Sequence, residues 1–290
     1  MLRQLVNEAR FALTLTTTGP LLIRSGQARL GNSDMVPVQT FRDGDWQVYV
    51  PGSSLKGAVR SHAERLLRSI RADAACDPFD GSSVCRSRSE SPDAATIYES
   101  LCCACRLFGS LTYAGRVAIG DCYLPRGARV RLERRNGVGI DRLTGGSSTG
   151  ALFDLEAVPS GVSFEGSVRL RNFEAWQLAL LLLVFEDLAQ GFVPLGGGRS
   201  RGYGAVTATI PLLSVTWCGM ERPPADAIWG LGQRLRGAYG TKEEDRLPTN
   251  TALNWSRQGV RWQATIEGPF EALRGTLEEA VVTAARERKR

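Results

Sequence analysis

Six of the seven cysteines lie between positions 76 and 122. Cys102 and Cys105 form a C-x-x-C pair, and Cys76 and Cys85 precede it. Four thiolates make a closed tetrahedral zinc site, which leaves no coordination position for a catalytic water. The sequence therefore predicts a structural Zn²⁺ held by Cys76, Cys85, Cys102 and Cys105. Cys103 could replace Cys102, and buried free thiols are the competing interpretation.

A glycine-rich turn with interleaved arginines, VPLGGGRSRGYG, occupies residues 193–204. Consecutive glycines let the backbone approach a ligand closely, and their N–H groups can cradle a phosphate. Gly197, Gly198, Arg199 and Arg201 are the candidate phosphate-binding residues here. The alternative is a flexible turn between a helix and a strand.

A second candidate anion site is PGSSLKG at residues 51–57, a turn that enters a helix. Helix N-termini bind anions through unpaired N–H groups, and Ser53, Ser54 and Lys56 add further donors. Arg60 follows on the same helix, one turn after Lys56. Ordinary capping of the helix by Ser53 or Ser54 is the alternative.

Two single residues could contribute to cleavage of a nucleic acid. Asp34 lies in the loop before PGSSLKG, where its carboxylate could hold a hydrated divalent ion or orient an attacking hydroxyl. His62, the only histidine, could act as a general base. However, it falls in the apolar helical series of Leu55, Val59 and Leu66, so we interpret it as a histidine at the edge of the core.

Arginine dominates the basic residues: 36 are basic, three of these are lysine, and the net charge is +6. Such a charge favours an acidic partner, and guanidinium groups match phosphate oxygens. Residues 126–161 concentrate this charge, with Arg135 and Arg142 as candidate RNA-binding residues beside the apolar Leu152 and Phe153. A basic flap of this kind can neutralise phosphates and wedge against bases, whereas the alternative is a disordered loop.

The elements that must position these residues follow the order β, α, β, β, α, β. The expected segments are a strand around Phe11–Leu15, a helix from about 53 to 70, a strand at Arg116–Leu124, a strand at Val162–Leu170, an apolar helix capped by Asn172 that ends near Gly191, and a strand at Ala205–Leu213. This order predicts an α+β fold with a ferredoxin-like, RNA-recognition-domain-like palm.

Insertions and an appendage complete the predicted organisation. Residues 1–220 form the palm, with insertions at 71–105 and 126–161, and residues 221–290 form a mixed α/β appendage. The N-terminus lacks a signal-peptide pattern, and the longest apolar run, at 178–185, is too short to span a bilayer. We therefore expect a cytoplasmic protein without a membrane partner.

Taken together, the motifs resemble the RAMP superfamily, specifically the zinc-bearing branch of backbone subunits in type III CRISPR effector complexes. The matching pieces run in family order over about residues 14–210: PGSSLKGAVRSH, LCCACRLFGS, GRVAIGD, GIDRLTGG, LFDLEAVPSG and PLGGGRSRGYG. The resemblance implies a palm with a zinc-binding insertion at 71–105 and a thumb hairpin at 126–161. Subunits of this family stack head-to-tail along a guide RNA.

The resemblance also implies a function. The PGSSLKG and glycine motifs would grip the CRISPR guide RNA, and Asp34 occupies the place of the family's target-cleaving aspartate. Cleavage of paired target RNA would require Mg²⁺ or another divalent cation. The partners would be the guide RNA, the target RNA, neighbouring RAMP subunits and the large polymerase-like subunit.

Three rival hypotheses stay open at this point. The loop around Asp34 lacks the glycine- and histidine-rich run of many relatives, which leaves room for a non-catalytic RNA scaffold of the same complex. A guide-processing endoribonuclease would use His62 as its base. A zinc-dependent scaffold that binds only protein is the third.

Overall fold

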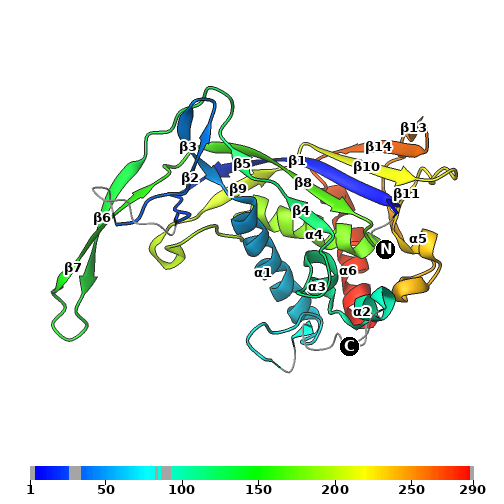
Figure 1. Ribbon diagram of the computed structural model, residues 1–290, viewed down its shortest axis with the longest axis horizontal. Coiled ribbons are helices and arrows are strands. Elements are labelled where there is room, and N and C mark those ends of the chain that lie inside the picture. The colour runs from blue at the N-terminus through cyan, green and yellow to red at the C-terminus, as the bar shows by residue number, and fades with distance from the viewer. Residues whose placement is uncertain (1–3, 26–33, 82–83, 86–92, 288–290) are drawn as a thin grey trace.

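The computed structural model describes residues 4–25, 34–81, 84–85 and 93–287. Its main feature is a ten-stranded antiparallel sheet (Figure 1). Along the sheet, the strands are β13 (Ser256–Gln258), β14 (Arg261–Glu267), β10 (Leu212–Cys218), β1 (Asn7–Thr17), β8 (Ser163–Arg171), β5 (Cys122–Tyr123), β3 (Asp45–Val50) and β2 (Gln39–Arg42). β9 (Val206–Thr209) also pairs with β1, and β4 (Val117–Ile119) also pairs with β8.

The central strand β1 shows why the sheet forms where it does. Its residues alternate between buried Phe11, Leu13 and Leu15 and more exposed neighbours, as the period-2 pattern predicts. β1 pairs with β8 over nine residue pairs, in a register that sets Phe11 opposite Val168. A shift by one residue would turn the apolar set towards solvent, so burial fixes this register.

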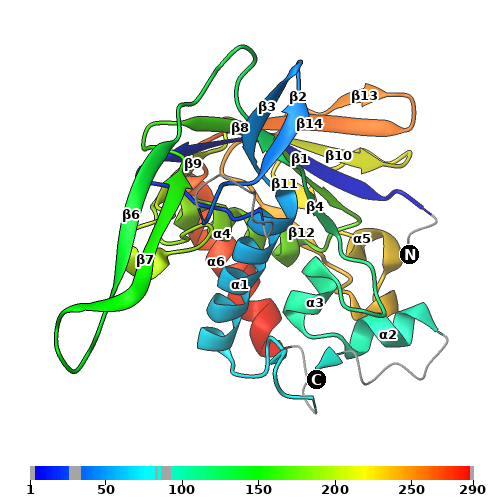
Figure 2. The same cartoon turned by 60° about the vertical axis from the view of Figure 1, so that its left-hand side comes forward.

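Helices cover one face of the sheet (Figures 1 and 2). They are α1 (Gly52–Ile70), α4 (Ala175–Ala189) and α6 (Arg274–Glu287), and α4 lies against both α1 and α6. α4 is apolar on nearly all sides, and its Phe185 meets Phe11 of β1 edge-on with ring centroids 5.3 Å apart. The core therefore lies between this helix layer and the sheet. Among the described residues, no helix is both long and apolar enough to cross a bilayer.

The predicted cap of α4 is wrong. Asn172 adopts a left-handed φ of 48°, and its side chain accepts a hydrogen bond from the Val6 N–H at 2.8 Å. The N-cap is instead Glu174, which forms a capping box with Gln177. Asn172 thus ties the start of β1 to the end of β8, and a buried glutamate begins the helix.

Smaller elements surround the sheet. Two short helices, α2 (Ala94–Ser100) and α3 (Cys103–Phe108), lie in the region of the predicted insertion. β6 (Glu133–Ile140) and β7 (Ser147–Ala157) form a hairpin that projects from the body of the protein (Figure 1). The C-terminal part adds β11 (Ala227–Trp229), α5 (Gly232–Leu235) and β12 (Arg246–Pro248), with 3-10 turns at Ala238–Gly240 and Glu271–Leu273. A further 3-10 turn, Arg199–Arg201, lies between α4 and β9.

Candidate functional site

Asp34 is fixed on the base of the β6–β7 hairpin. Its backbone N–H donates to Asp154 Oδ1 at 3.1 Å, and the Asp154 N–H donates to Asp34 Oδ2 at 3.1 Å. The next residue, Met35, forms a β-bridge with Leu155 and accepts a hydrogen bond from the Glu156 N–H at 2.9 Å. The Asp34 side chain nevertheless stays exposed, so its carboxylate is accessible to a ligand.

Next to Asp34, the negative charge of Asp154 is balanced by an arginine of the same hairpin. Asp154 of β7 pairs with the Arg134 guanidinium of β6 across the two strands. Arg134 is exposed, so a phosphate that approaches Asp34 would meet this guanidinium as well. Arg134 lies within the predicted basic flap, but the sequence pattern gave no signal that it lies next to Asp34.

The glycine-rich turn needs its glycines for steric reasons. Gly196 and Gly204 have φ of 74° and 86°. A Cβ would lie 2.4 Å from Leu22 O at the first position and 2.0 Å from Leu195 O at the second. The Gly197 N–H donates to Leu22 O at 2.9 Å, so this donor serves the fold. Phosphate contacts at this turn would therefore depend chiefly on the exposed side chains of Arg199 and Arg201.

The glycine turn lies against the hairpin. The Arg201 guanidinium stands over the Phe153 ring, 5.4 Å from its centroid, and Arg135 stands over Tyr203 at 5.8 Å. Beneath them is a small apolar cluster of Leu22, Leu155 and Ala157, packed against Met35, Phe153 and Tyr203. Three segments far apart in the sequence, around residues 34, 154 and 201, therefore meet at one place. We call this place the hairpin junction.

Arg24 is a further basic residue near the hairpin junction. A Cβ at Gly197 would lie 3.4 Å from Arg24 Nε, and Arg24 forms a β-bridge with Pro37. Arg24 is exposed. Sequence reasoning missed it because it lies in a segment of mixed polarity with no periodicity.

The PGSSLKG segment begins α1, but neither serine caps the helix. Pro51 is the N-cap and makes no side-chain hydrogen bond, while the Gly52 N–H donates to Asp121 Oδ1 at 2.7 Å. The predicted cap by Ser53 or Ser54 is therefore wrong. Ser53 is exposed and Ser54 is half-buried in the first turn. A Cβ at Gly52 would lie 2.3 Å from Ile119 O, which explains the glycine.

Lys56 and Arg60 are partly committed to other contacts. Lys56 Nζ donates to Val117 O at 3.1 Å, and burial, followed by the charge of Arg60, lowers the pKa of Lys56. Arg60 bonds to Glu64 at 2.8 Å and to Gly109 O at 3.1 Å. Within the described part of the chain, no hydrogen bond or ion pair joins the PGSSLKG group to the hairpin junction.

Arg142 lies at the far end of the hairpin. It lies in the turn between β6 and β7 and is exposed. In the portion of the chain that the structure describes, it forms no ion pair. It is therefore available to a ligand.

The structure brings together the four cysteines that the sequence selected. The Sγ atoms of Cys76, Cys85, Cys102 and Cys105 all lie within 4.8 Å of one another, and all four residues are buried. Cys76 Sγ and Cys105 Sγ are 3.6 Å apart. Four sulfur ligands at such distances can hold a metal ion such as zinc.

The four thiols act on one another, because hydrogen bonds with Cys102 lower the pKa of Cys76 and raise that of Cys105. The Cys102 N–H donates to Cys85 Sγ and the Cys105 N–H to Cys102 Sγ, both at 3.4 Å, and Arg60 Nη2 lies 3.5 Å from Cys105 Sγ. A hydrogen bond from the Cys102 thiol is the main reason that the pKa of Cys85 falls to about 7. Thiolates are the form that binds a metal.

Cys103 lies outside the cluster. It is buried separately, and burial raises the pKa of its thiol to about 11. Of the two alternatives that the sequence left open, the geometry thus favours Cys102 as a ligand. The insertion is also held by Arg68 of α1, which donates to Ala75 O at 3.3 Å and to Cys76 O at 2.5 Å.

His62 joins two helices of the core. Its Nε2 lies 2.6 Å from Asp187 Oδ2, so the pair links α1 to α4. Only 12% of the His62 side chain is exposed. These contacts agree with its interpretation as a histidine at the edge of the core.

A comparison with models of protein families identifies the family of the chain. Residues 14–207 match the model of the RAMP superfamily. The chain belongs to the RAMP superfamily. Members of this superfamily are generally CRISPR-associated RNA-binding proteins. In this RAMP protein, the matched region contains the hairpin junction, PGSSLKG and the cysteine cluster. The chain matches none of the curated proteins.

Proposed function

We propose that this RAMP protein is a guide-RNA-binding backbone subunit of a type III CRISPR effector complex, of the zinc-bearing branch. The observation that carries the proposal is the hairpin junction, where exposed arginines from two distant segments lie beside the accessible carboxylate of Asp34. Base pairing would supply sequence recognition, while the protein reads the backbone and shape of the RNA.

The proposed palm is ferredoxin-like. In chain order, β1 leads through α1 to β4 and β5, and β8 leads through α4 to β9 and β10. In the sheet, β9 and β10 lie on one side of β1, and β8 lies between β1 and the β4 and β5 pair. This arrangement supports a palm over residues 1–220, with the hairpin at 126–161 as its thumb and residues 221–290 as an appendage.

The guide RNA would be held by its phosphates. Arg199 and Arg201 flank the glycine turn with Gly197 and Gly198, and Arg135 lies across from them on the hairpin. Ser53, Ser54, Lys56 and Arg60 would form a second contact at the start of α1, and Arg142 a third at the hairpin end. Because each phosphate contact releases a counterion from the RNA, the affinity should fall as the salt concentration rises.

Asp34 is the proposed catalytic residue for cleavage of guide-paired target RNA. Its Oδ2 is oriented by the Asp154 N–H, while Oδ1 has no hydrogen-bond partner within the described residues. A carboxylate held in this way fits a hydrated Mg²⁺ or similar ion, which would supply charge stabilisation at the phosphate. Asp34 would position the 2′-hydroxyl, and Arg134 would neutralise the phosphate.

The decisive experiment compares Asp34→Asn with the wild type in the assembled complex. Asparagine can still accept the Asp154 N–H, so this substitution removes the charge and leaves the contact. We expect guide binding to persist and target cleavage to fall at least about a hundredfold. Glu165→Gln, at an exposed position of β8, is the control. Cleavage at full rate by Asp34→Asn would favour the non-catalytic scaffold.

The cysteine cluster is proposed to bind a structural Zn²⁺ through Cys76, Cys85, Cys102 and Cys105. All four ligands are thiols, so the ion would stabilise the insertion without open coordination for chemistry. Metal analysis of the purified protein tests this directly, because an absence of stoichiometric zinc would contradict it.

A further inference from the structure

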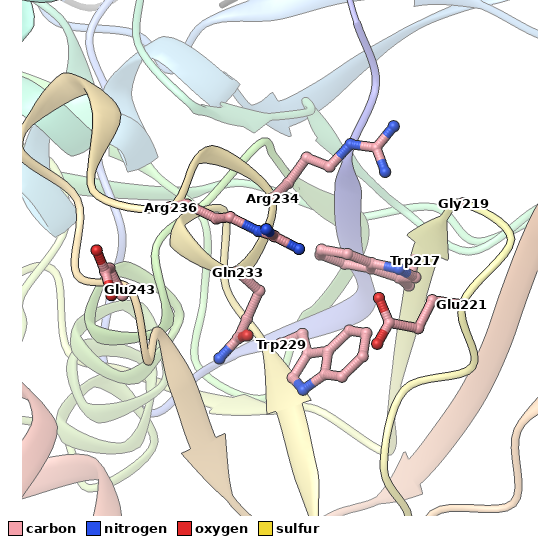
Figure 3. Close-up of a pocket in the computed structure, with 8 residues that line it drawn as sticks. All are labelled: Trp217, Gly219, Glu221, Trp229, Gln233, Arg234, Arg236 and Glu243. Atoms are coloured by element: carbon pink, nitrogen blue, oxygen red, sulfur yellow. The ribbon is translucent and has the colours of Figure 1, made fainter.

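β11 and α5 lie at the opposite end of the protein from the β6–β7 hairpin (Figure 1), and a cavity is formed beside them (Figure 3). It has a volume of about 610 Å³, within the usual range for small-ligand sites of roughly 300–1,000 Å³. The end of β10 supplies Trp217 and the following turn supplies Glu221, while β11 supplies Trp229 and α5 supplies Gln233. These residues follow the region 14–207 that matches the family model, so the cavity is a feature of the C-terminal segment.

Two indole rings form one wall of this cavity. Trp217 and Trp229 meet edge-on, with centroids 5.1 Å apart. Trp217 is buried and Trp229 is half-buried, so the pair is held firmly and Trp229 supplies most of the accessible aromatic surface. Aromatic surface of this kind favours a flat aromatic ring such as a nucleobase.

Charged groups of both signs line the rest of the cavity. Arg234, Arg236, Glu221 and Glu243 are all exposed. Within the described residues, none of these four forms an ion pair, although they share one cavity. Figure 3 shows the Glu221 carboxylate beside both indoles and Arg236 directed towards Trp217 from the other side. The cavity therefore presents guanidinium donors that can bind an anion and carboxylate acceptors that can bind the hydrogen-bond donors of a ring.

The backbone around Arg236 is constrained. Arg236 and Tyr239 have left-handed φ of 47° and 62°, on either side of Gly237 at 84°. Non-glycine residues adopt this conformation at a cost, and such positions cluster at ligand sites. The sharp reversal after α5 turns the Arg236 side chain towards the cavity (Figure 3).

We propose that this cavity binds a guanine nucleotide. Among the common bases, guanine offers two adjacent donors, N1–H and the 2-amino group, which match the two oxygens of the Glu221 carboxylate. The base would lie against the tryptophans with the Gln233 amide at its edge, and the guanidinium of Arg236 would take the phosphate. The source is either a free nucleotide or an unpaired guanosine of an RNA strand.

Calorimetric titration of the purified full-length protein with GMP, AMP and CMP tests the proposal. We expect GMP to bind at least about tenfold more tightly than AMP, because adenine lacks the paired donors. Glu221→Gln should remove that preference, whereas Arg236→Gln should weaken GMP and AMP alike. Glu244→Gln and Arg222→Gln, exposed neighbours that do not line the cavity, are the matched controls.

A competition experiment separates the two sources of the ligand. Short single-stranded RNAs that contain one guanosine or one inosine, which lacks the 2-amino group, are added to the GMP-bound protein. If the guanosine strand displaces GMP and the inosine strand does not, the natural ligand is an unpaired guanosine of RNA. If GMP stays bound in the presence of both strands, the natural ligand is a free nucleotide. Either outcome supports guanine recognition.

Two results would overturn the proposal. One is the lack of detectable heat with millimolar GMP for a protein with an intact melting transition. The other is equal GMP affinity in wild type and Glu221→Gln. Neither bears on guide binding, which depends on arginines at the hairpin junction and can be measured separately with the same preparations.

Discussion

Asp34 and Asp154 each donate a backbone N–H to the other's carboxylate, at 3.1 Å in both directions. This reciprocal pair couples the loop before PGSSLKG to the β6–β7 hairpin. Any movement of the hairpin base would therefore displace the proposed catalytic carboxylate.

Asp154→Ala should impair target cleavage although Asp154 is not itself proposed to act on RNA. It removes the acceptor for the Asp34 N–H and leaves Arg134 without its carboxylate. A misplaced catalytic group costs a large factor in rate, so we expect a loss of at least about tenfold in the assembled complex. Asp154→Asn keeps an acceptor and should lose less. Equal rates for wild type and Asp154→Ala would show that the pair does not position Asp34.

The arginines of the hairpin junction should determine the salt dependence of RNA binding. Arg201→Gln and Arg135→Gln each remove one proposed phosphate contact. Each should lower the slope of log affinity against log salt by about 0.7, as expected for a single strand. Arg65→Gln, an exposed arginine on α1, is the control. Unchanged slopes in both junction variants would place the RNA elsewhere.

Removal of one zinc ligand should destabilise the insertion. We expect Cys105→Ser to lose bound zinc and to lower the melting temperature, and a chelator to have the same effect on the wild type. Cys103→Ser changes a buried thiol outside the cluster and should retain stoichiometric metal. Loss of zinc in Cys103→Ser, with retention in Cys102→Ser, would reverse the ligand assignment.

Asp245 should make stability depend on pH. Its Oδ1 accepts the Ala175 N–H at the start of α4, and its Oδ2 accepts the Gly232 N–H, both at 2.8 Å. Burial, followed by the charge of Glu174, raises the pKa of Asp245 to about 7. The folded state thus keeps a proton that the unfolded carboxyl loses near its ordinary pKa. The free energy of unfolding should therefore fall as pH rises, until the pH exceeds about 7.

Chemical denaturation between pH 5 and pH 8 measures this effect. Asp245 should contribute a decrease of about 2–4 kcal/mol over the full window. Asp245→Asn cannot ionise, so its unfolding free energy should change less with pH than that of the wild type. Glu174, whose pKa burial also raises, would supply the remaining dependence. Identical pH profiles would show that Asp245 does not titrate in this range.

Local patterns predicted the elements well where one physical rule dominates. The alternation around Phe11 predicted β1, and the C-x-x-C pair with two preceding cysteines predicted a cluster because such sets are typical of structural metal sites. The caps of α1 and α4 were wrong because a cap depends on partners distant in sequence. The Gly52 N–H donates a hydrogen bond to the Asp121 side chain, and the Asn172 side chain accepts one from the Val6 N–H.

The site depends on contacts that sequence spacing does not report. Asp34 and Asp154 are 120 residues apart, and Arg201 meets Phe153 across the same junction. The cavity lined by Trp217 and Trp229 arises because the segment after β10 folds back on the end of that strand. Neither arrangement has a motif, so neither could be read from the chain alone.

β14 pairs with β10 along its whole length, from Leu212 opposite Glu267 to Cys218 opposite Arg261. Without this partner, the backbone donors and acceptors on one side of β10 would face solvent, and open edges of that kind recruit strands from other molecules. β14 thus covers an edge of the sheet that would otherwise be open. A version of the protein that ended after β10 would expose this edge and would be prone to aggregation, however sound its RNA-binding surface.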